Sequence, residues 1–394
     1  MRIISIGMIM NAPERPDSCN SVLVQKNTDL FDRDYNIYNE NLFNYALCTE
    51  RKRTERSQRP FLLLLLNIER LLQEENAKGA VKDMLSVLRK SLRNIDLCGW
   101  YKYNSVIGVL FPELGTQNTH AALEAIGLKI HGDLLRNFPL GIVNKMDIRF
   151  SFFPEKLDEV TTAGLANKMF YPDISRERKG KRAALFVKRI IDIMGSIFCM
   201  FLYSPFFLTI PVLIKLTSPG PVLFRQERVG LFGQKFIFLK FRSMHVNNND
   251  SLHREFVRQL ITGNKGREAE GSGEDALYKI KDDPRVTPLG KILRKTSLDE
   301  IPQFLNVLKG EMSLVGPRPA IQYELEDYDI WHRHRLLHVK PGITGLWQVM
   351  GRSSTNFDEM VRLDLKYIRE WSPWLDLKIL LMTPMAVLRG KGAY

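Results

Sequence analysis

The chain has 394 residues, which excludes a single domain of ordinary size, and its character changes near residue 180. Its 57 Lys and Arg residues against 44 Asp and Glu residues give a net charge of +13, which disfavours a basic partner and favours an anionic one. The charge alone fits RNA as well as a membrane surface.

The N-terminal part reads as two segments. Residues 1–44 are mostly polar and irregular, which predicts a flexible lead. In residues 45–160, segments with the apolar spacing of helices alternate with segments that have the spacing of strands. The predicted elements are a helix ending near Ser57, a buried strand over 60–69, a helix over Val81–Asn94, a hairpin over Leu97–Phe111, a helix over His120–Asn137 and a strand over 147–153. This order predicts an α+β domain around an antiparallel sheet.

That order of elements resembles the diguanylate cyclase (GGDEF-type) fold. Where that family carries a Gly-Gly-acidic-acidic turn, this chain has Tyr103, Asn104 and Ser105. Asn67 stands at the approximate position of a metal-binding aspartate of the family. The resemblance therefore implies a degenerate, catalytically silent domain with a regulatory or assembly role.

Residues 161–184 are predicted to be a basic linker. Seven basic side chains and a single acid, Glu177, lie between residues 176 and 189; the basic residues are Arg176, Arg178, Lys179, Lys181, Arg182, Lys188 and Arg189. Because an apolar segment follows at once, the cluster favours contact with anionic lipid headgroups over binding to nucleic acid.

Residues 185–217 are predicted to form a membrane anchor. The 22 residues from Ile193 to Ile214 include no charged side chain. A helix of about 20 apolar residues is long enough to cross the hydrocarbon core of a bilayer, so the segment has sufficient length. Ser204 and Pro205 interrupt the segment at its middle, and basic residues flank it on both sides. These features predict a helix broken at Ser204-Pro205 that enters and leaves by the cytoplasmic face. A simple span and a buried core helix are the alternatives.

Further along, KFIFLKFR alternates as a strand does. The alternation puts Lys240 and Arg242 on one face, where two cations converge. An ordinary exposed strand face is an equally good interpretation for Lys240.

The adjacent acids Asp299 and Glu300 are the strongest candidates for chemistry. Pro302 is tolerated only in the first turn of a helix, so the helix is predicted to begin near Asp299 and to end at Gly310. A helix N-terminus keeps carboxylates ionised, as a nucleophile or metal ligand requires. The alternative is a capping box from Ser297 to Glu300.

Two arginines accompany these acids. Arg294 lies five residues before Asp299, and Arg318 lies between two prolines that stiffen the backbone. A guanidinium held in this way suits bidentate contact with phosphate, although a solvated arginine in a rigid turn is as good an interpretation.

The order of these blocks resembles the bacterial sugar transferases, the monotopic polyprenyl-phosphate phosphoglycosyl transferases. The similarity covers about residues 183 to 390 and rests on the broken anchor and on the blocks SPGPVLFRQERVGLFGQKFIFLKFRSM, DDPRVTPLGKILRKTSLDEIPQ, GPRP and KPGITGLWQVMGR. It implies a proline-broken re-entrant helix followed by a compact α/β catalytic domain over residues 218–394.

The resemblance also implies an activity. Members transfer a sugar 1-phosphate from a UDP-sugar to undecaprenyl phosphate, release UMP, require Mg²⁺ and begin exopolysaccharide or surface glycan synthesis. It implies that Asp299 forms a covalent phosphosugar intermediate, that Glu300 assists, and that both acids hold the metal. It also implies that basic side chains bind the substrate phosphates, and the candidates are Arg294, Arg318, Arg352, Lys240 and Arg242.

The resulting expectation is an enzyme at the cytoplasmic face of the bacterial inner membrane that contacts membrane lipids but no nucleic acid; homo-oligomerisation stays open. A metal-dependent hydrolase of sugar nucleotides or lipid diphosphates would use the same two acids. An inactive membrane scaffold is the non-enzymatic alternative.

Overall fold

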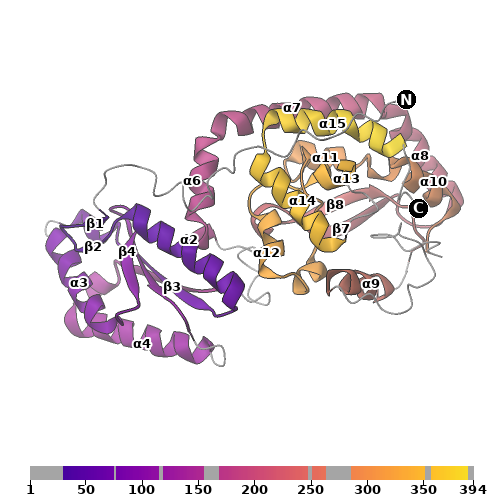
Figure 1. Ribbon diagram of the computed structural model, residues 1–394. Helices are drawn as coiled ribbons and strands as arrows, with labels where there is room; N and C mark the ends of the chain where they lie inside the picture. Colours follow the sequence, from indigo (N-terminus) through magenta and orange to yellow (C-terminus); the bar gives the residue numbers. More distant parts are fainter. Residues whose placement is uncertain are drawn as a thin grey trace, which may run out of the picture. The chain divides into compact units, whose positions relative to one another are not determined.

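The computed structural model describes residues 30–74, 77–114, 119–154, 168–246, 251–262, 285–350 and 356–388 (Figure 1). They form two compact units: those of the first lie within Met1–Glu155 and Lys168–Glu177, and those of the second within Arg178–Tyr394. Helices and sheets occur in both units, which confirms the α+β class.

The first unit is built on a six-stranded sheet in the order β1-β2-β4-β5-β3-β6. The strand β3, next to the edge strand β6, pairs antiparallel with both β5 and β6, as the register of Leu64 opposite Val109 and Phe150 shows. The strands are β1 Phe31–Asp32, β2 Ile37–Tyr38, β3 Phe61–Asn67, β4 Leu97–Lys102, β5 Val106–Phe111 and β6 Asp147–Phe153.

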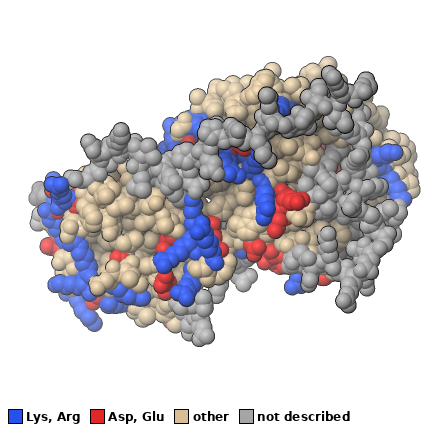
Figure 2. Space-filling model, in the orientation of Figure 1, with Lys and Arg blue, Asp and Glu red and all other residues tan. Residues whose placement is uncertain are grey.

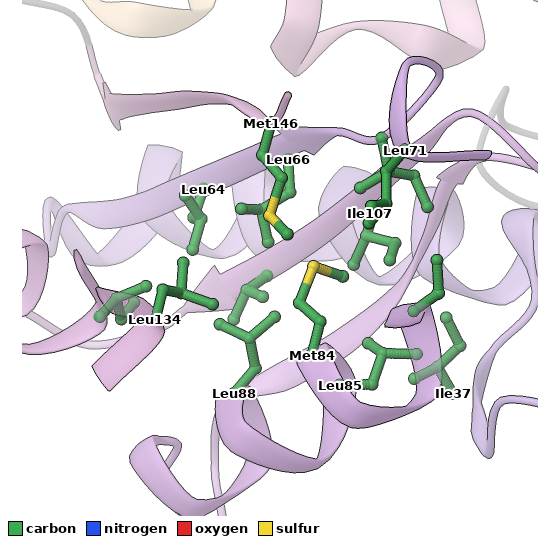
Figure 3. Close-up of a cluster of buried hydrophobic side chains, with 14 of the residues drawn as sticks. Ile37, Leu64, Leu66, Leu71, Met84, Leu85, Leu88, Ile107, Leu134 and Met146 are labelled. Atoms are coloured by element: carbon green, nitrogen blue, oxygen red, sulfur yellow. The ribbon is translucent and has the colours of Figure 1, made fainter. Parts of the chain in front are cut away.

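Helices accompany this sheet, namely α2 Glu40–Ser57, η1 Leu71–Gln73, α3 Ala77–Ser91, α4 Thr119–Asn137, α5 Leu140–Val143, η3 Lys168–Phe170 and most of α6 Pro172–Gly180. All but the last residue of β3 are buried, because both faces of this leucine-rich strand are covered. Figure 3 shows Leu64 and Leu66 of β3 and Met84, Leu85 and Leu88 of α3 pointing into one apolar cluster.

The predicted order of elements in this unit agrees with the structure from the helix ending at Ser57 to the strand Asp147–Phe153. The predicted irregular lead over 1–44 is wrong in its last part, since β1, β2 and the start of α2 lie there. Asn39 begins α2 by accepting a hydrogen bond from the Leu42 amide. The many polar N-cap and turn residues in this region make the short elements look irregular in the sequence.

The second unit begins with α7 Arg182–Leu202 and α8 Ser204–Thr217, which meet at a bend of 60°. The predicted break is therefore present, with Pro205 in the first turn of α8. Among the described helices, none alone is long and apolar enough to cross a membrane, whereas α7 and α8 together reach that length and composition. Within the predicted basic linker over 161–184, the described residues from Lys168 onward form η3, α6 and the start of α7.

One face of α7 and α8 is apolar and exposed, with Phe201 81% and Leu216 78% exposed. The opposite face of α7 turns Lys188 and Asp192 inward, where both are buried. Lys188 Nζ lies 2.6 Å from Asp376 Oδ2, and Asp192 Oδ1 accepts hydrogen bonds from Ser313 and Leu314. Buried charges thus fasten the anchor to the rest of the unit.

Two small sheets follow the anchor. One is antiparallel in the order β10-β7-β8, and the other pairs β11 with β9 in parallel; the strands are β7 Leu223–Val229, β8 Lys235–Phe241, β9 Ser313–Val315, β10 Ala320–Ile321 and β11 Gly342–Thr344. The antiparallel sheet departs from the predicted compact α/β arrangement.

The remaining helices of the second unit are η4 Leu231–Gly233, α9 Ser251–Thr262, α10 Pro288–Thr296, η6 Leu298–Glu300, α11 Gln303–Lys309, η7 Gln322–Glu326, α12 Ile330–Arg333, η8 His334–Leu336, α13 Leu346–Met350, α14 Phe357–Glu370 and α15 Pro373–Leu388. α15 packs on α7 and continues through Pro384. In Figure 2 few charged side chains lie along the upper edge, where Figure 1 places α7 and α15.

Candidate active site

Asp299 lies in a sharp turn between two helices. Ser297 ends α10 in the left-handed conformation, with φ of 58°, and Leu298–Glu300 then form a single 3-10 turn. α11 begins only at Gln303, after the N-cap Pro302. The predicted helix start near Asp299 is therefore wrong by about one turn. The capping-box alternative is wrong as well, because Ser297 makes no side-chain capping bond.

Lys240 joins both acids. Its Nζ atom lies 3.4 Å from Asp299 Oδ2 and 2.8 Å from Glu300 Oε1. The Asp299 side chain is only 7% exposed, whereas that of Glu300 is 35% exposed. Burial strengthens the attraction between opposite charges, so Lys240 helps to hold the Asp299 side chain in place. An ionised carboxylate beside a cation can act as a nucleophile.

Asn306 fixes α11 against β8 and so sets the approach of Lys240 to the acids. Its amide nitrogen donates to the Ile237 carbonyl at 2.7 Å, and its oxygen accepts from the Leu239 amide at 3.2 Å. The side chain is fully buried and also donates to Glu311. Asn306 thereby bonds to β8 as a neighbouring strand would.

Arg294 projects from α10, the helix before the acids. Its Nε atom donates to Ser243 Oγ at 3.0 Å. The start of α10 packs closely on the same residue: a Cβ on Gly290 would come within 2.0 Å of the Ser243 carbonyl oxygen. Glycine is required by this approach, which holds α10 and Arg294 at the end of β8.

The turn Gly316–Pro319 that carries Arg318 is held by its carbonyls. The Pro317 carbonyl accepts from the Gly342 amide at 2.8 Å. The next two carbonyls accept from buried guanidinium groups, that of Arg318 from Arg335 at 2.6 Å and that of Pro319 from Arg228 at 2.7 Å. Three consecutive carbonyls are thus bonded, which fixes the backbone of the turn that carries Arg318.

Nothing in the sequence pointed to a role for Arg228. This residue of β7 is buried, and its guanidinium lies 4.6 Å from the centre of the Phe238 ring. Burial lowers the pKa of Arg228 to about 10, with a further lowering by the charge of Arg318, while Glu300 acts in the opposite direction. Arg228, Arg318 and Glu300 therefore share one electrostatic neighbourhood. An arginine in a polar strand carries no hydropathy signal of burial.

Arg242 does not converge with Lys240. The strand β8 ends at Phe241, so its alternation does not extend to residue 242. The Arg242 guanidinium donates to the carbonyls of Ser218 and Pro219, both at 2.8 Å, and to the Ser218 hydroxyl at 2.7 Å. The guanidinium of Arg242 thus ties the end of α8 to the sheet, whereas the ammonium group of Lys240 contacts the two acids.

Arg352 lies outside the described residues. Within the parts of the chain that the structure describes, no group of three or more His, Cys, Asp or Glu side chains could hold a metal ion. The pair Asp299 and Glu300 still fits Mg²⁺, which commonly takes one or two carboxylates and completes its shell with water and substrate phosphate.

The sequence profile of the bacterial sugar transferase family matches residues 183–390, more than half of the chain. The chain belongs to the bacterial sugar transferases. This confirms the resemblance drawn from the motifs, and the match covers Asp299, Glu300, Lys240 and the turn that carries Arg318.

Curated relatives agree with this assignment. The transferase is 46% identical over 216 residues to galactosyl transferase CpsE of Streptococcus agalactiae, a match over 54% of this chain and 44% of that protein. It is 41% identical over 215 residues to UDP-glucose:undecaprenyl-phosphate glucose-1-phosphate transferase of Escherichia coli, over 53% of this chain and 41% of that protein. The chain thus spans less than half the length of these relatives.

A shorter relative is covered almost whole. Exopolysaccharide production protein ExoY of Rhizobium meliloti is 40% identical over 210 residues, which are 52% of this chain and 88% of that protein. Among solved structures, a GGDEF domain from Pseudomonas aeruginosa is similar over 32% of this chain and 76% of the GGDEF chain, with 15% sequence identity and a TM-score of 0.26. The GGDEF-type resemblance of the first unit stays a prediction.

Proposed function

We propose that this transferase moves a sugar 1-phosphate from a UDP-sugar to undecaprenyl phosphate, which yields a polyprenyl-diphosphate sugar and UMP and begins exopolysaccharide or surface glycan synthesis. The names of the E. coli and R. meliloti relatives support the reaction and its biological setting. The observation that carries the proposal is the buried carboxylate of Asp299 beside Lys240 in a member of this family.

The proposed reaction has two displacements at one phosphorus atom. An Asp299 carboxylate oxygen attacks the phosphorus that carries the sugar, the bond to the bridging oxygen breaks, and UMP leaves with that oxygen. A phosphate oxygen of undecaprenyl phosphate then attacks the same phosphorus, and the Asp299 carboxylate leaves. Each step forms one bond to phosphorus and breaks one, so the enzyme ends unchanged.

Cations reduce the repulsion between a carboxylate and a diphosphate. Lys240 contacts both acids, with its Nζ atom 3.4 Å from Asp299 Oδ2 and 2.8 Å from Glu300 Oε1. Arg294 and Arg318 are assigned to the phosphates, and the bonded carbonyls of the Gly316–Pro319 turn support a preorganised position for Arg318. The same assignment is extended to Arg352 from its place in the family motif alone.

Mg²⁺ is proposed as the metal, with Asp299 and Glu300 as its protein ligands. When bound, it would neutralise charge on the diphosphate oxygens. The ammonium group of Lys240 contacts both carboxylates, which supports the two acids acting together on one ion.

The exposed apolar face of α7 and α8, together with their bend at Ser204-Pro205, supports a monotopic placement at the cytoplasmic face of the inner membrane. Such a placement brings the lipid acceptor to the enzyme at the membrane surface. Lipids of the inner membrane are then direct contacts of the anchor.

The test is UMP release by the detergent-purified full chain with Mg²⁺, undecaprenyl phosphate and a panel of UDP-sugars. Asp299→Asn keeps the size of the side chain but removes the nucleophilic carboxylate, and it should lower UMP release by about three orders of magnitude or more. Glu326→Gln removes an exposed acid of the same unit and should leave the rate unchanged.

The alternatives give different results in this assay. Sustained UMP release without lipid would indicate a hydrolase of sugar nucleotides that uses the same acids. Silence with every UDP-sugar in the panel would favour the membrane scaffold. Trapping of sugar phosphate on Asp299 in the absence of acceptor, detected by mass spectrometry, would separate the covalent route from direct transfer.

A further inference from the structure

A second group of cations lies apart from the acids. It comprises Arg178, Arg189 and Lys340, which come from the end of α6, from α7 and from the segment before β11. The Arg189 Nη2 and Lys340 Nζ atoms both lie within 3.5 Å of the position that a Cβ on Gly310 would take. We call these three residues the basic triad.

Two members of the triad are held in place by backbone carbonyls. Arg189 donates to the carbonyls of Val307 and Leu308, both at 2.7 Å, and so caps the C-terminal end of α11. Arg178 donates to the His338 carbonyl at 3.1 Å. Each guanidinium has five N–H donors, so both keep donors for a ligand after these bonds are made.

The third member, Lys340, has no hydrogen-bond acceptor and no carboxylate within ion-pair distance among the described residues. Burial lowers the pKa of Lys340, and Arg189 and Arg178 lower it further. Asp192 opposes this effect, but its carboxylate already accepts bonds from Ser313 and Leu314. The fold therefore keeps three cations together at an electrostatic cost that an anion would relieve.

The triad is separate from the candidate active site. Asp299 precedes the first turn of α11, whereas the triad surrounds its last turn. The seven residues of α11 span about 10 Å. A phosphate bound at Asp299 cannot reach both ends of this helix.

Exposed apolar side chains adjoin the triad on α7. Phe186 and Ile190, within one turn of Arg189, are 68% and 46% exposed. They begin the apolar face that continues along α7 to Phe201. The triad thus stands where the charged and apolar surfaces of the anchor meet, the level at which lipid headgroups lie.

We propose that the basic triad binds the phosphate of an anionic phospholipid headgroup, as a lipid site distinct from the site of transfer. This proposal rests on the membrane placement given under the proposed function. The phosphate would accept hydrogen bonds from Lys340 and from the remaining donors of the two arginines, and it would pair the ammonium group, which has no carboxylate partner among the described residues.

The test is amine labelling of the full chain in nanodiscs of phosphatidylcholine, with or without phosphatidylglycerol. An acylating reagent attacks the unprotonated amine, so a phosphate that stabilises the ammonium form of Lys340 slows its labelling. Mass spectrometry should show labelling of Lys340 about fivefold slower with phosphatidylglycerol. Lys309, an exposed lysine at the end of α11, is the internal control and should label equally in both discs.

Variants sharpen the test. Arg178→Gln should reduce the slowing at Lys340, while Lys309→Gln should leave it intact. Equal labelling of Lys340 in the two discs, or equal slowing at Lys309, would overturn the proposal. Equal protection by inorganic phosphate in phosphatidylcholine discs would assign the site to a soluble phosphate instead. The labelling needs no turnover, so its outcome is independent of UMP release.

Discussion

The two units of this chain reach stability by different means. The first buries a continuous apolar cluster around β3, in which Leu64, Leu66 and Trp100 are fully inaccessible. The second also has apolar clusters, but charged side chains are buried among its elements; they include Lys188, Asp192, Arg228, Arg335, Asp364 and Asp376. Such groups cost free energy to bury and are retained only with partners. The first unit also buries a charged pair, Arg51 and Asp173, 2.9 Å apart, but its core is mainly apolar. The second unit therefore depends more on particular charged pairs than the first does.

The Lys188 network illustrates this dependence. Lys188 Nζ donates to Asp376, to the Val315 carbonyl at 3.0 Å and to the Tyr367 hydroxyl at 3.4 Å. Tyr367 and Trp371 donate in turn to the two oxygens of Asp376, at 2.6 and 3.2 Å. One anchor residue thus joins α7, β9, α14 and α15.

The largest effect is expected at the ion pair of Arg335 with Asp364, whose side chains are each 1% exposed and lie 3.2 Å apart. Asp364→Ala leaves a buried guanidinium without its carboxylate, which should cost about 4 kcal/mol of unfolding free energy. Because Arg335 also holds the Arg318 carbonyl, UMP release should fall as well. Chemical denaturation and the UMP assay measure the two effects.

The double variant Arg335→Met with Asp364→Leu separates stability from function. Replacement of a buried pair by apolar side chains is often neutral or stabilising, so the double variant should recover most of the lost unfolding free energy. It should not recover UMP release, since the double variant lacks the Arg335 guanidinium that donates to the Arg318 carbonyl. Recovery of both would show that Arg335 acts through stability alone.

A smaller loss is expected in the apolar first unit. Leu64→Ala removes buried methyl groups at the centre of β3 and should cost about 3 kcal/mol. Leu128, which is 75% exposed on α4, provides the matched control, and Leu128→Ala should change stability by less than about 0.5 kcal/mol. Hydrogen exchange should place the loss of protection in the first unit. Protection lost equally across both units would contradict the contrast drawn above.

The smallest effect is a pH dependence. Burial raises the pKa of Asp364 to about 6, against the opposing pull of Arg335. The folded chain then binds this proton more tightly than the unfolded chain, so the contribution of Asp364 to stability grows as pH falls from above 6 toward about 4, the ordinary value of aspartate. The unfolding midpoint of the native chain should rise over this range relative to that of Asp364→Asn. A constant difference would show that Asp364 has an ordinary pKa.

Hydropathy allowed much of the fold to be predicted. The strand β3 could be predicted from its run of leucines, and the hairpin at Asn104 from the turn residues between two apolar segments. The broken anchor is visible for the same reason, since Pro205 interrupts an uncharged segment. Short elements such as β1 and β2, two residues each, carry too few positions to show a period.

The site was predictable only in part. Sequence reasoning found the acids and Lys240, because adjacent carboxylates and alternating cations are visible as residue types. It missed Arg228 and Asn306, whose roles come from burial between elements distant in sequence. It also misplaced Arg242, since the end of a strand at Phe241 is not marked by any residue type.

The bonds between α7 and the rest of the second unit bear on how the enzyme can be produced. A chain shortened to begin after Thr217 would lose the cation that pairs with Asp376 and the donor for the Val307 and Leu308 carbonyls. Buried polar and charged groups that have lost their partners destabilise the folded state, so the shortened chain should fold poorly. We therefore expect that α7 and α8 have to be produced and purified together with the rest of the second unit, because they are part of its core.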